Sequence, residues 1–92
     1  MQPAWWSEYD RPILELLAES EKALPPRVIL FNLKYENRAS PHRSTVKRRL
    51  QRLSSHGLVK RVDEAGYYII TETGEQYLTG EVDANKLEQN DS

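Results

Sequence analysis

The side chains best suited to chemistry are the arginines, lysines and small hydroxyls that crowd one central segment. Residues 27–61 carry ten Lys or Arg and one acid, a local charge of +9. Residues 1–26 carry a charge of −3 and residues 62–92 a charge of −7, so the net charge of −1 conceals this sorting. A segment that gathers cations and excludes acids attracts a polyanion, most often nucleic acid. The alternative is a solvated charged helix that binds nothing.

Other kinds of site have little support in the chain. Cysteine is absent, which removes disulfides, thiolate chemistry and Cys-based zinc sites. The two histidines, His42 and His56, have no carboxylate or second histidine at ligand spacing. Ser54 and Ser55 precede His56 without an orienting acid, and the four glycines do not form a phosphate loop. We therefore expect no enzyme activity, no metal, no cofactor and no small-molecule ligand.

Size and composition predict one small domain. The chain has 92 residues, 38% of them hydrophobic, and its N-terminus lacks the basic start and apolar run of a signal peptide. No apolar stretch approaches the roughly 20 residues that a membrane span needs. We expect a cytoplasmic protein without membrane contact. Residues 1–80 are expected to form the DNA-binding domain and residues 81–92 an acidic, partly disordered tail.

Capping residues and prolines predict two helices before residue 34. Ser7 or Asp10 can cap the first, which continues to about residue 20 at helical apolar spacing. A short extended link at 23–24 follows, and Pro25-Pro26 then begins the second helix. The residues of this helix expected to be mostly buried are Val28, Ile29, Leu30, Phe31 and Leu33.

A third helix and a hairpin follow a polar loop at 34–39. Ser40 and Pro41 are expected at the N-cap and first position of the helix, which runs to about residue 56. Two strands at 58–62 and 67–70 flank a turn, and a capped helix begins after residue 71. We expect the core to combine Val46, Leu50 and Leu53 with Leu14, Leu17, Val28 and Phe31, with Leu58 and Ile69 closing the hairpin side. His42 is expected on the core side of its helix.

The third helix opposes its apolar stripe with a polar face that suits a DNA major groove. Arginine can grip guanine O6 and N7 with two hydrogen bonds, and glutamine can do the same with adenine. Residues that read bases lie toward the N-terminal part of such a helix. We expect Ser44, Thr45 and Arg48 to contact bases, and Arg43, Lys47, Arg49 and Arg52 to hold phosphates. Gln51, Arg38, Lys60 and Arg61 complete the predicted DNA-binding set, although the hairpin tip, Asp63-Glu64, is acidic.

These segments resemble a known class of regulators. Residues 44–62 resemble the recognition helix and first wing strand of winged-helix transcription regulators, and residues 68–78 the second wing strand and last helix. Within that class the chain is similar to small haloarchaeal regulators related to repressors of halophilic archaeal phages, through Trp5/Trp6, residues 10–15, 68–71 and 77–84. The resemblance implies an α+β, mainly α, winged helix-turn-helix: three helices, a β-hairpin wing and a C-terminal helix. It also implies an archaeal virus or provirus repressor.

Two functions from different classes follow. The first is sequence-specific binding of double-stranded DNA that represses transcription by steric occlusion of a promoter. The alternative is a winged-helix protein–protein interaction module of a transcription or chromatin complex, which the retained basic helix disfavours. RNA is a weaker option, because the basic face lacks an aromatic platform for bases.

A single recognition helix contacts few base pairs, so we expect a homodimer on a palindromic operator. The residues expected at the dimer interface are Trp5, Trp6, Tyr77 and Leu78. Another interpretation of the tryptophans is that one of them closes the core over the last helix.

Overall fold

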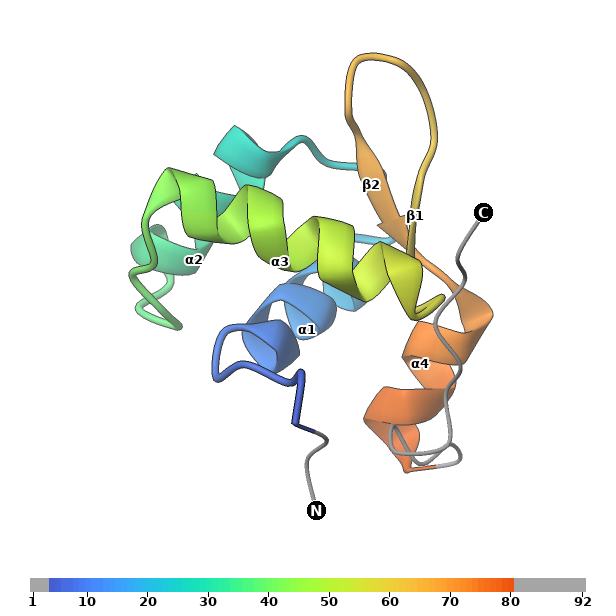
Figure 1. Cartoon of the computed structure of the whole chain (residues 1–92). Coiled ribbons are helices and arrows are strands. Elements are labelled where there is room, and N and C mark those ends of the chain that lie inside the picture. Colours follow the sequence, from blue (N-terminus) through green and yellow to red (C-terminus); the bar gives the residue numbers. More distant parts are fainter. Residues whose placement is uncertain (1–3, 81–92) are drawn as a thin grey trace.

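The computed structural model describes residues 4–80, within which four helices pack together and a two-stranded antiparallel hairpin projects beside the C-terminal end of the third (Figure 1). In chain order the elements are α1 (Asp10–Ser20), α2 (Pro26–Tyr35), α3 (Arg43–Ser55), β1 (Val59–Arg61), β2 (Tyr68–Ile70) and α4 (Glu72–Thr79). This is the predicted winged helix-turn-helix: α2 and α3 form the helix-turn-helix and the hairpin forms the wing. The tail predicted for residues 81–92 lies outside the described residues.

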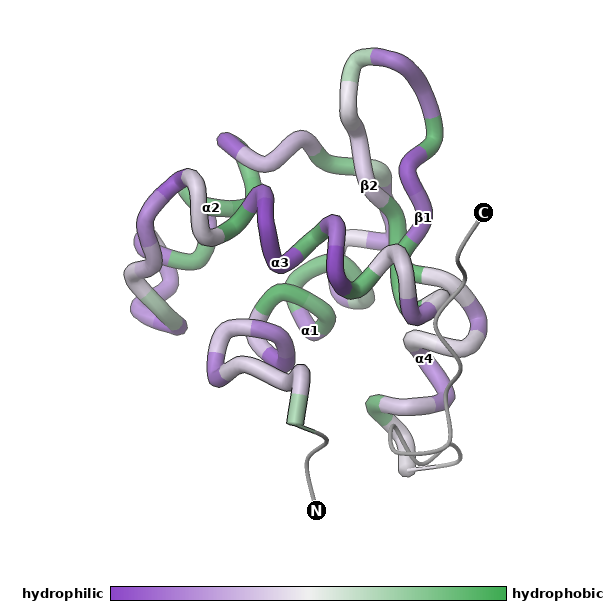
Figure 2. Tube along the Cα trace, viewed as in Figure 1, coloured by the Kyte–Doolittle hydropathy of each residue, from purple (hydrophilic) through white to green (hydrophobic). Residues whose placement is uncertain are grey.

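Helix α3 forms one wall of the core. Its predicted stripe of Val46, Leu50 and Leu53 is fully buried and lies in one cluster with Leu14 and Leu17 of α1. Figure 2 shows hydrophobic positions of α1 beneath α3, whereas much of the visible length of α3 is hydrophilic. The apolar spacing of α3 therefore predicted its buried side correctly.

The second helix differs from the prediction at Phe31, which is 62% exposed. Ile29 and Leu33 are the fully buried residues of α2. Two residues correspond to about 200° of helical rotation, so a helix that buries Ile29 turns Phe31 to solvent. The Phe31 ring instead stacks on that of Tyr35, with 5.7 Å between centroids, and Tyr35 is 75% exposed.

The wing is joined to the helices by the link that precedes α2. Leu24 and Tyr68 exchange two backbone hydrogen bonds of 2.8 and 2.9 Å, which confirms the extended link and gives it a partner. The paired residues of the hairpin are Val59 with Ile70, Lys60 with Ile69, and Arg61 with Tyr68. Tyr68 is buried and Ile69 only half-buried, because successive strand residues face opposite sides. The prediction that Ile69 closes the core is therefore wrong.

The start of α3 also differs from the prediction. The helix begins at Arg43, and its N-cap is His42, whose side chain forms no capping hydrogen bond. Pro41 is buried just before the helix and Ser40 is exposed, so neither takes its predicted place. His42 is exposed rather than on the core side. At the other end Gly57 does adopt the left-handed conformation, with φ of 78°.

Helix α4 is fixed to the base of the wing by Thr71. The Thr71 hydroxyl accepts a hydrogen bond from the Gly74 N–H at 3.0 Å, as the predicted cap requires, and donates to the Gly57 carbonyl at 2.7 Å. A Cβ atom on Gly74 would lie 2.2 Å from the Leu58 carbonyl oxygen. Only glycine permits this close approach of α4 to the strand.

The two tryptophans pack onto the protein's own elements. The Trp5 ring stacks on His56, with 3.8 Å between centroids, and the Trp6 ring lies 4.9 Å from that of Tyr77 in α4. Leu78 also packs against the core. The interpretation that a tryptophan closes the core over the last helix is confirmed. All four residues nevertheless remain partly exposed.

The core assignment predicts unequal effects of two alanine substitutions. Leu50→Ala should lower the free energy of unfolding by about 2–5 kcal/mol, because it leaves a cavity among fully buried side chains. Phe31→Ala should change it by less than about 0.5 kcal/mol, because that ring is mostly in water. Denaturant unfolding followed by circular dichroism measures both. Equal losses would show that the rotation of α2 or of α3 is wrong.

Candidate nucleic-acid interface

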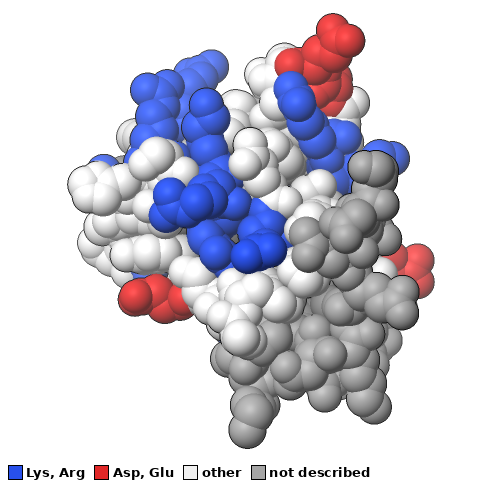
Figure 3. Space-filling model, viewed as in Figure 1, with Lys and Arg blue, Asp and Glu red and all other residues white. Residues whose placement is uncertain are grey.

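The outward face of α3 displays the side chains that the sequence assigned to DNA. Thr45 is half-buried, and the exposed members are Arg43, Ser44, Lys47, Arg48, Gln51 and Arg52. Figure 3 shows Lys and Arg gathered over α3 and the neighbouring elements, with acids at the tip of the wing and at the edges of this view. Within residues 4–80, none of the four exposed cations of α3 forms an ion pair. Their charges are therefore available to a ligand.

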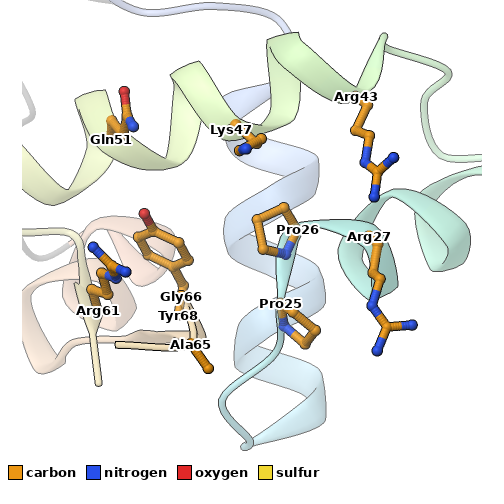
Figure 4. A pocket seen from close by; sticks show the side chains of 10 residues that line it. All are labelled: Pro25, Pro26, Arg27, Arg43, Lys47, Gln51, Arg61, Ala65, Gly66 and Tyr68. Carbon is orange, nitrogen blue, oxygen red and sulfur yellow. The ribbon is translucent and has the colours of Figure 1, made fainter. Parts of the chain in front are cut away.

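A groove of about 420 Å³ runs between α3, the N-terminal end of α2 and the wing. Figure 4 shows Arg43, Lys47 and Gln51 along α3, with Arg27 at the α2 end and Arg61 beside Tyr68 at the wing end. No acid among residues 4–80 lines this groove. A concave surface lined by cations of three elements focuses positive potential and favours an anionic ligand.

Arg27 is a member of this surface that the sequence analysis did not assign. It lies in the first turn of α2 and is exposed. Its place in the basic segment 27–61, which holds a single acid, was the available signal. Proximity to Arg43 depends on how α2 packs beside α3, which the sequence pattern does not specify.

The two cations at the base of the wing that were predicted to contact DNA lie on opposite faces of the strand. The Arg61 guanidinium donates to the Glu64 carbonyl oxygen at 2.8 Å and lines the groove. Lys60, on the opposite face of the strand, does not line it. Asp63 and Glu64 are exposed at the tip, so the tip itself repels phosphates.

Arg38, which the sequence analysis assigned to the DNA-binding set, is paired within the protein. Its guanidinium pairs with Glu19, the last acid of α1, and with Glu36 at 2.8 Å. The hydrogen bond from Arg38 holds the pKa of the Glu19 carboxyl below its usual range, and the same bond raises the pKa of Arg38. The side chain thus braces the turn between α2 and α3 against α1 instead of facing outward with the free cations.

Arg49, the second of these arginines, is also paired within the protein. Its Nε donates to Asp10 Oδ1 at 2.9 Å, and one terminal nitrogen donates to Asp10 Oδ2 at 2.8 Å and to the Trp5 carbonyl at 2.6 Å. The Arg49 side chain is 14% exposed and the Asp10 side chain is fully buried. Arg49 therefore forms an internal ion pair in this structure, whereas the sequence analysis expected a phosphate contact.

Other site chemistry is not apparent in the part of the chain that the structure describes. Residues 4–80 contain no group of three His, Cys, Asp or Glu that could hold a metal ion. No helix among the described residues is long and apolar enough to cross a bilayer.

Comparisons with known proteins show the family and the fold. Residues 2–90 match the family model of the winged helix-turn-helix phage repressor. The chain is 36% identical over 88 residues to the repressor protein of Halobacterium phage phiH, covering 92% of each sequence. It also resembles the crystal structure of the PhiH1 repressor-like protein from Haloarcula marismortui, with a TM-score of 0.79 and 35% identity, covering 97% of this chain and 94% of the other.

The contact between Arg38 and Glu19 predicts a titration shift. Arg38→Ala should raise the pKa of Glu19 toward its usual range, because the main cause of its depression is removed. NMR of the Glu19 carboxyl during a pH titration measures this. The stabilisation from this contact is present above the unfolded pKa and is lost as pH falls through the folded pKa, so the variant should lose less stability over that range. A Glu19 pKa that does not respond to Arg38→Ala would contradict the contact.

Proposed function

Because this chain belongs to the winged helix-turn-helix phage repressor family, we propose that it binds a specific sequence of double-stranded DNA and represses transcription. The family is one of DNA-binding repressors and not of enzymes. The observation that carries the proposal is the outward face of α3, where exposed Arg43, Lys47, Arg48 and Arg52 form no ion pair within residues 4–80. Unpaired cations on a helix that also presents Ser44 suit a major groove.

In this proposal α3 lies in the major groove with its N-terminal half against the bases. Ser44 and Thr45 are small enough to let the helix approach closely. Arg48 is the side chain best placed to grip a guanine edge, and Gln51 can reach an adenine. Arg43, Lys47 and Arg52 are then phosphate contacts that fix the register.

The groove beside α3 supplies a seat for one sugar-phosphate backbone. Four cations from three elements line it, and no acid of the described part of the chain does: Arg27, Arg43, Lys47 and Arg61. A DNA strand that passes between α3 and the wing would meet all four cations. The phosphates would repel the acidic wing tip, Asp63-Glu64. The base of the wing therefore contributes to DNA binding and the tip does not.

Repression by steric occlusion needs no further machinery. A protein seated on an operator that overlaps a promoter prevents polymerase from binding there. The similar protein of Halobacterium phage phiH is itself described as a repressor. We propose that this chain does the same for an archaeal virus or provirus, in the cytoplasm where that DNA lies.

A protein–protein interaction module is the second candidate, and one observation favours it. Phe31 and Tyr35 stack on each other while mostly exposed, and exposed aromatic patches often mark contacts with other proteins. The unpaired cations of α3 favour DNA instead, because a module that binds only protein has no need of them. A mobility-shift assay with the DNA upstream of its own gene separates these two functions.

Substitutions at two neighbouring positions of α3 should have different effects on DNA binding. Arg48→Ala should weaken binding to the operator by about 1–3 kcal/mol and relax the preference for one base. Lys47→Ala should weaken binding to all sequences alike and reduce the salt slope by about one unit. Fluorescence anisotropy with operator and unrelated duplexes over a range of salt concentrations measures both effects.

Arg48→Lys is the matched control for this pair. It keeps the charge and loses the planar fork, so we expect the salt slope of the original protein with a reduced base preference. Unchanged operator affinity in an Arg43/Lys47/Arg48 triple alanine variant would contradict the placement of α3 in the groove.

We also propose that two copies bind a palindromic operator. One α3 contacts few base pairs, and two-fold pairing doubles both the contacts and the sequence read. The partly exposed edges of Trp5, Trp6, Tyr77 and Leu78 remain the proposed interface, although each residue also packs within its own protomer. This surface belongs to the N-terminal segment and α4, and none of these residues lines the groove.

Light scattering tests the dimer. We expect about twice the 10.7 kDa of one chain, and a monomer for Leu78→Ala. The control is Phe31→Ala with Tyr35→Ala, which should remain a dimer because α2 lies outside the proposed interface. A monomer for this double variant, together with a dimer for Leu78→Ala, would place the interface on α2. A mass near 10.7 kDa, together with one copy per operator, would contradict the dimer.

A further inference from the structure

Arg49 is the arginine of α3 that turns inward, and its guanidinium donates hydrogen bonds to two different residues. Its guanidinium forms two hydrogen bonds with the Asp10 carboxylate, at 2.9 and 2.8 Å, and a third with the Trp5 carbonyl at 2.6 Å. The other three arginines of α3 are exposed. Asp10 and Trp5 precede Arg49 in the chain by 39 and 44 residues, so both contacts are long-range.

Asp10 connects this arginine to two more segments. Its Oδ2 also accepts a hydrogen bond from the Ser7 N–H at 2.9 Å, and Asp10 is the first residue of α1. Trp5, at the other end of this short segment, stacks on His56 just beyond the C-terminal end of α3. Residues 5–10 therefore touch α3 both at its middle and at its C-terminal end.

A buried ion pair of this kind supplies geometry more readily than stability. Desolvation of Asp10 and Arg49 offsets much of their attraction, so a well-packed apolar pair of similar size would stabilise the fold about as well. A guanidinium that donates two hydrogen bonds to one carboxylate, however, holds that carboxylate in its own plane and at one distance. Leu50 and Val46 pack by shape alone. The two hydrogen bonds between Arg49 and Asp10 add a directional contact that restricts the rotation of α3 about its axis.

We propose that Arg49 is a positioning residue for DNA reading: its fork on Asp10 fixes the rotation of α3 about its own axis. Arg48 lies about 100° from Arg49 around the helix, so a rotation that loosens Arg49 also displaces Arg48. The proposal rests on the DNA-binding function proposed above. It assigns the N-terminal segment a part in sequence preference without any contact between that segment and DNA.

A phosphate contact and a positioning role at Arg49 predict different results. A phosphate contact would make Arg49→Ala flatten the salt dependence by about one unit, and Asp10→Asn would leave DNA binding unchanged. A positioning role makes Asp10→Asn and Arg49→Lys each lower the ratio of operator to unrelated-duplex affinity, by about tenfold, with the salt slope nearly constant. The double variant should lose little more than either single one, because both remove the same contact.

The experiment measures anisotropy with operator and unrelated duplexes for Asp10→Asn, Arg49→Lys, Arg49→Ala and the Asp10→Asn/Arg49→Lys double variant of the full chain. Each is held at a temperature at which circular dichroism shows it folded. Arg11→Lys is the matched control, an arginine paired with Glu15 on the exposed side of α1 and outside the proposed DNA-binding set, and should keep the full ratio. If Asp10→Asn does not fold, Arg49→Lys retains the buried charge and still tests the fork.

Several results would overturn the proposal. A lower thermal midpoint with an unchanged affinity ratio in folded Asp10→Asn and Arg49→Lys would make the contact merely structural. A flattened salt slope in Arg49→Ala alone would make Arg49 a phosphate contact. Failure of the DNA-binding function itself is recognised separately, because the unsubstituted protein would then show no preference for any duplex.

Discussion

The bidentate contact between Asp10 and Arg49 holds the start of the fold to the middle of its charged helix. Helix α3 has to be half core and half charged surface, with Val46, Leu50 and Leu53 fully buried on one side. A cation on the flank between those sides has to be either solvated or neutralised. The Asp10 carboxylate pairs with this cation, while the other arginines of α3 stay in water.

The charge sorting along the chain therefore has two structural outcomes. Two arginines of the basic segment form ion pairs with acids of the N-terminal third of the chain. Arg49 pairs with Asp10, and Arg38 pairs with Glu19. Of the arginines and lysines that remain, four line the groove across α2, α3 and the wing, where no acid of the described residues lies: Arg27, Arg43, Lys47 and Arg61. Salt dependence of DNA binding is expected from the second group and not from the first, because the first group is already paired within the protein.

Local signals predicted the order of elements and the buried side of α3, since apolar spacing and caps such as Thr71 act within a few residues. They did not predict Phe31, because a helix of mainly apolar residues does not reveal which side packs. They also did not distinguish Arg49 from Arg48. Both are arginines of one helix, and their difference depends on a carboxylate 39 residues away that only the packing of α1 brings close.

Methylation interference on the operator tests the central claim, that the outward face of α3 reads base edges in the major groove. Methylation of guanine N7 blocks that groove, whereas methylation of adenine N3 blocks the minor groove. We predict loss of binding from N7 methylation at one or more guanines, and little effect from adenine N3. Interference confined to adenine N3, or equal affinity for methylated and unmethylated duplexes, would contradict the account.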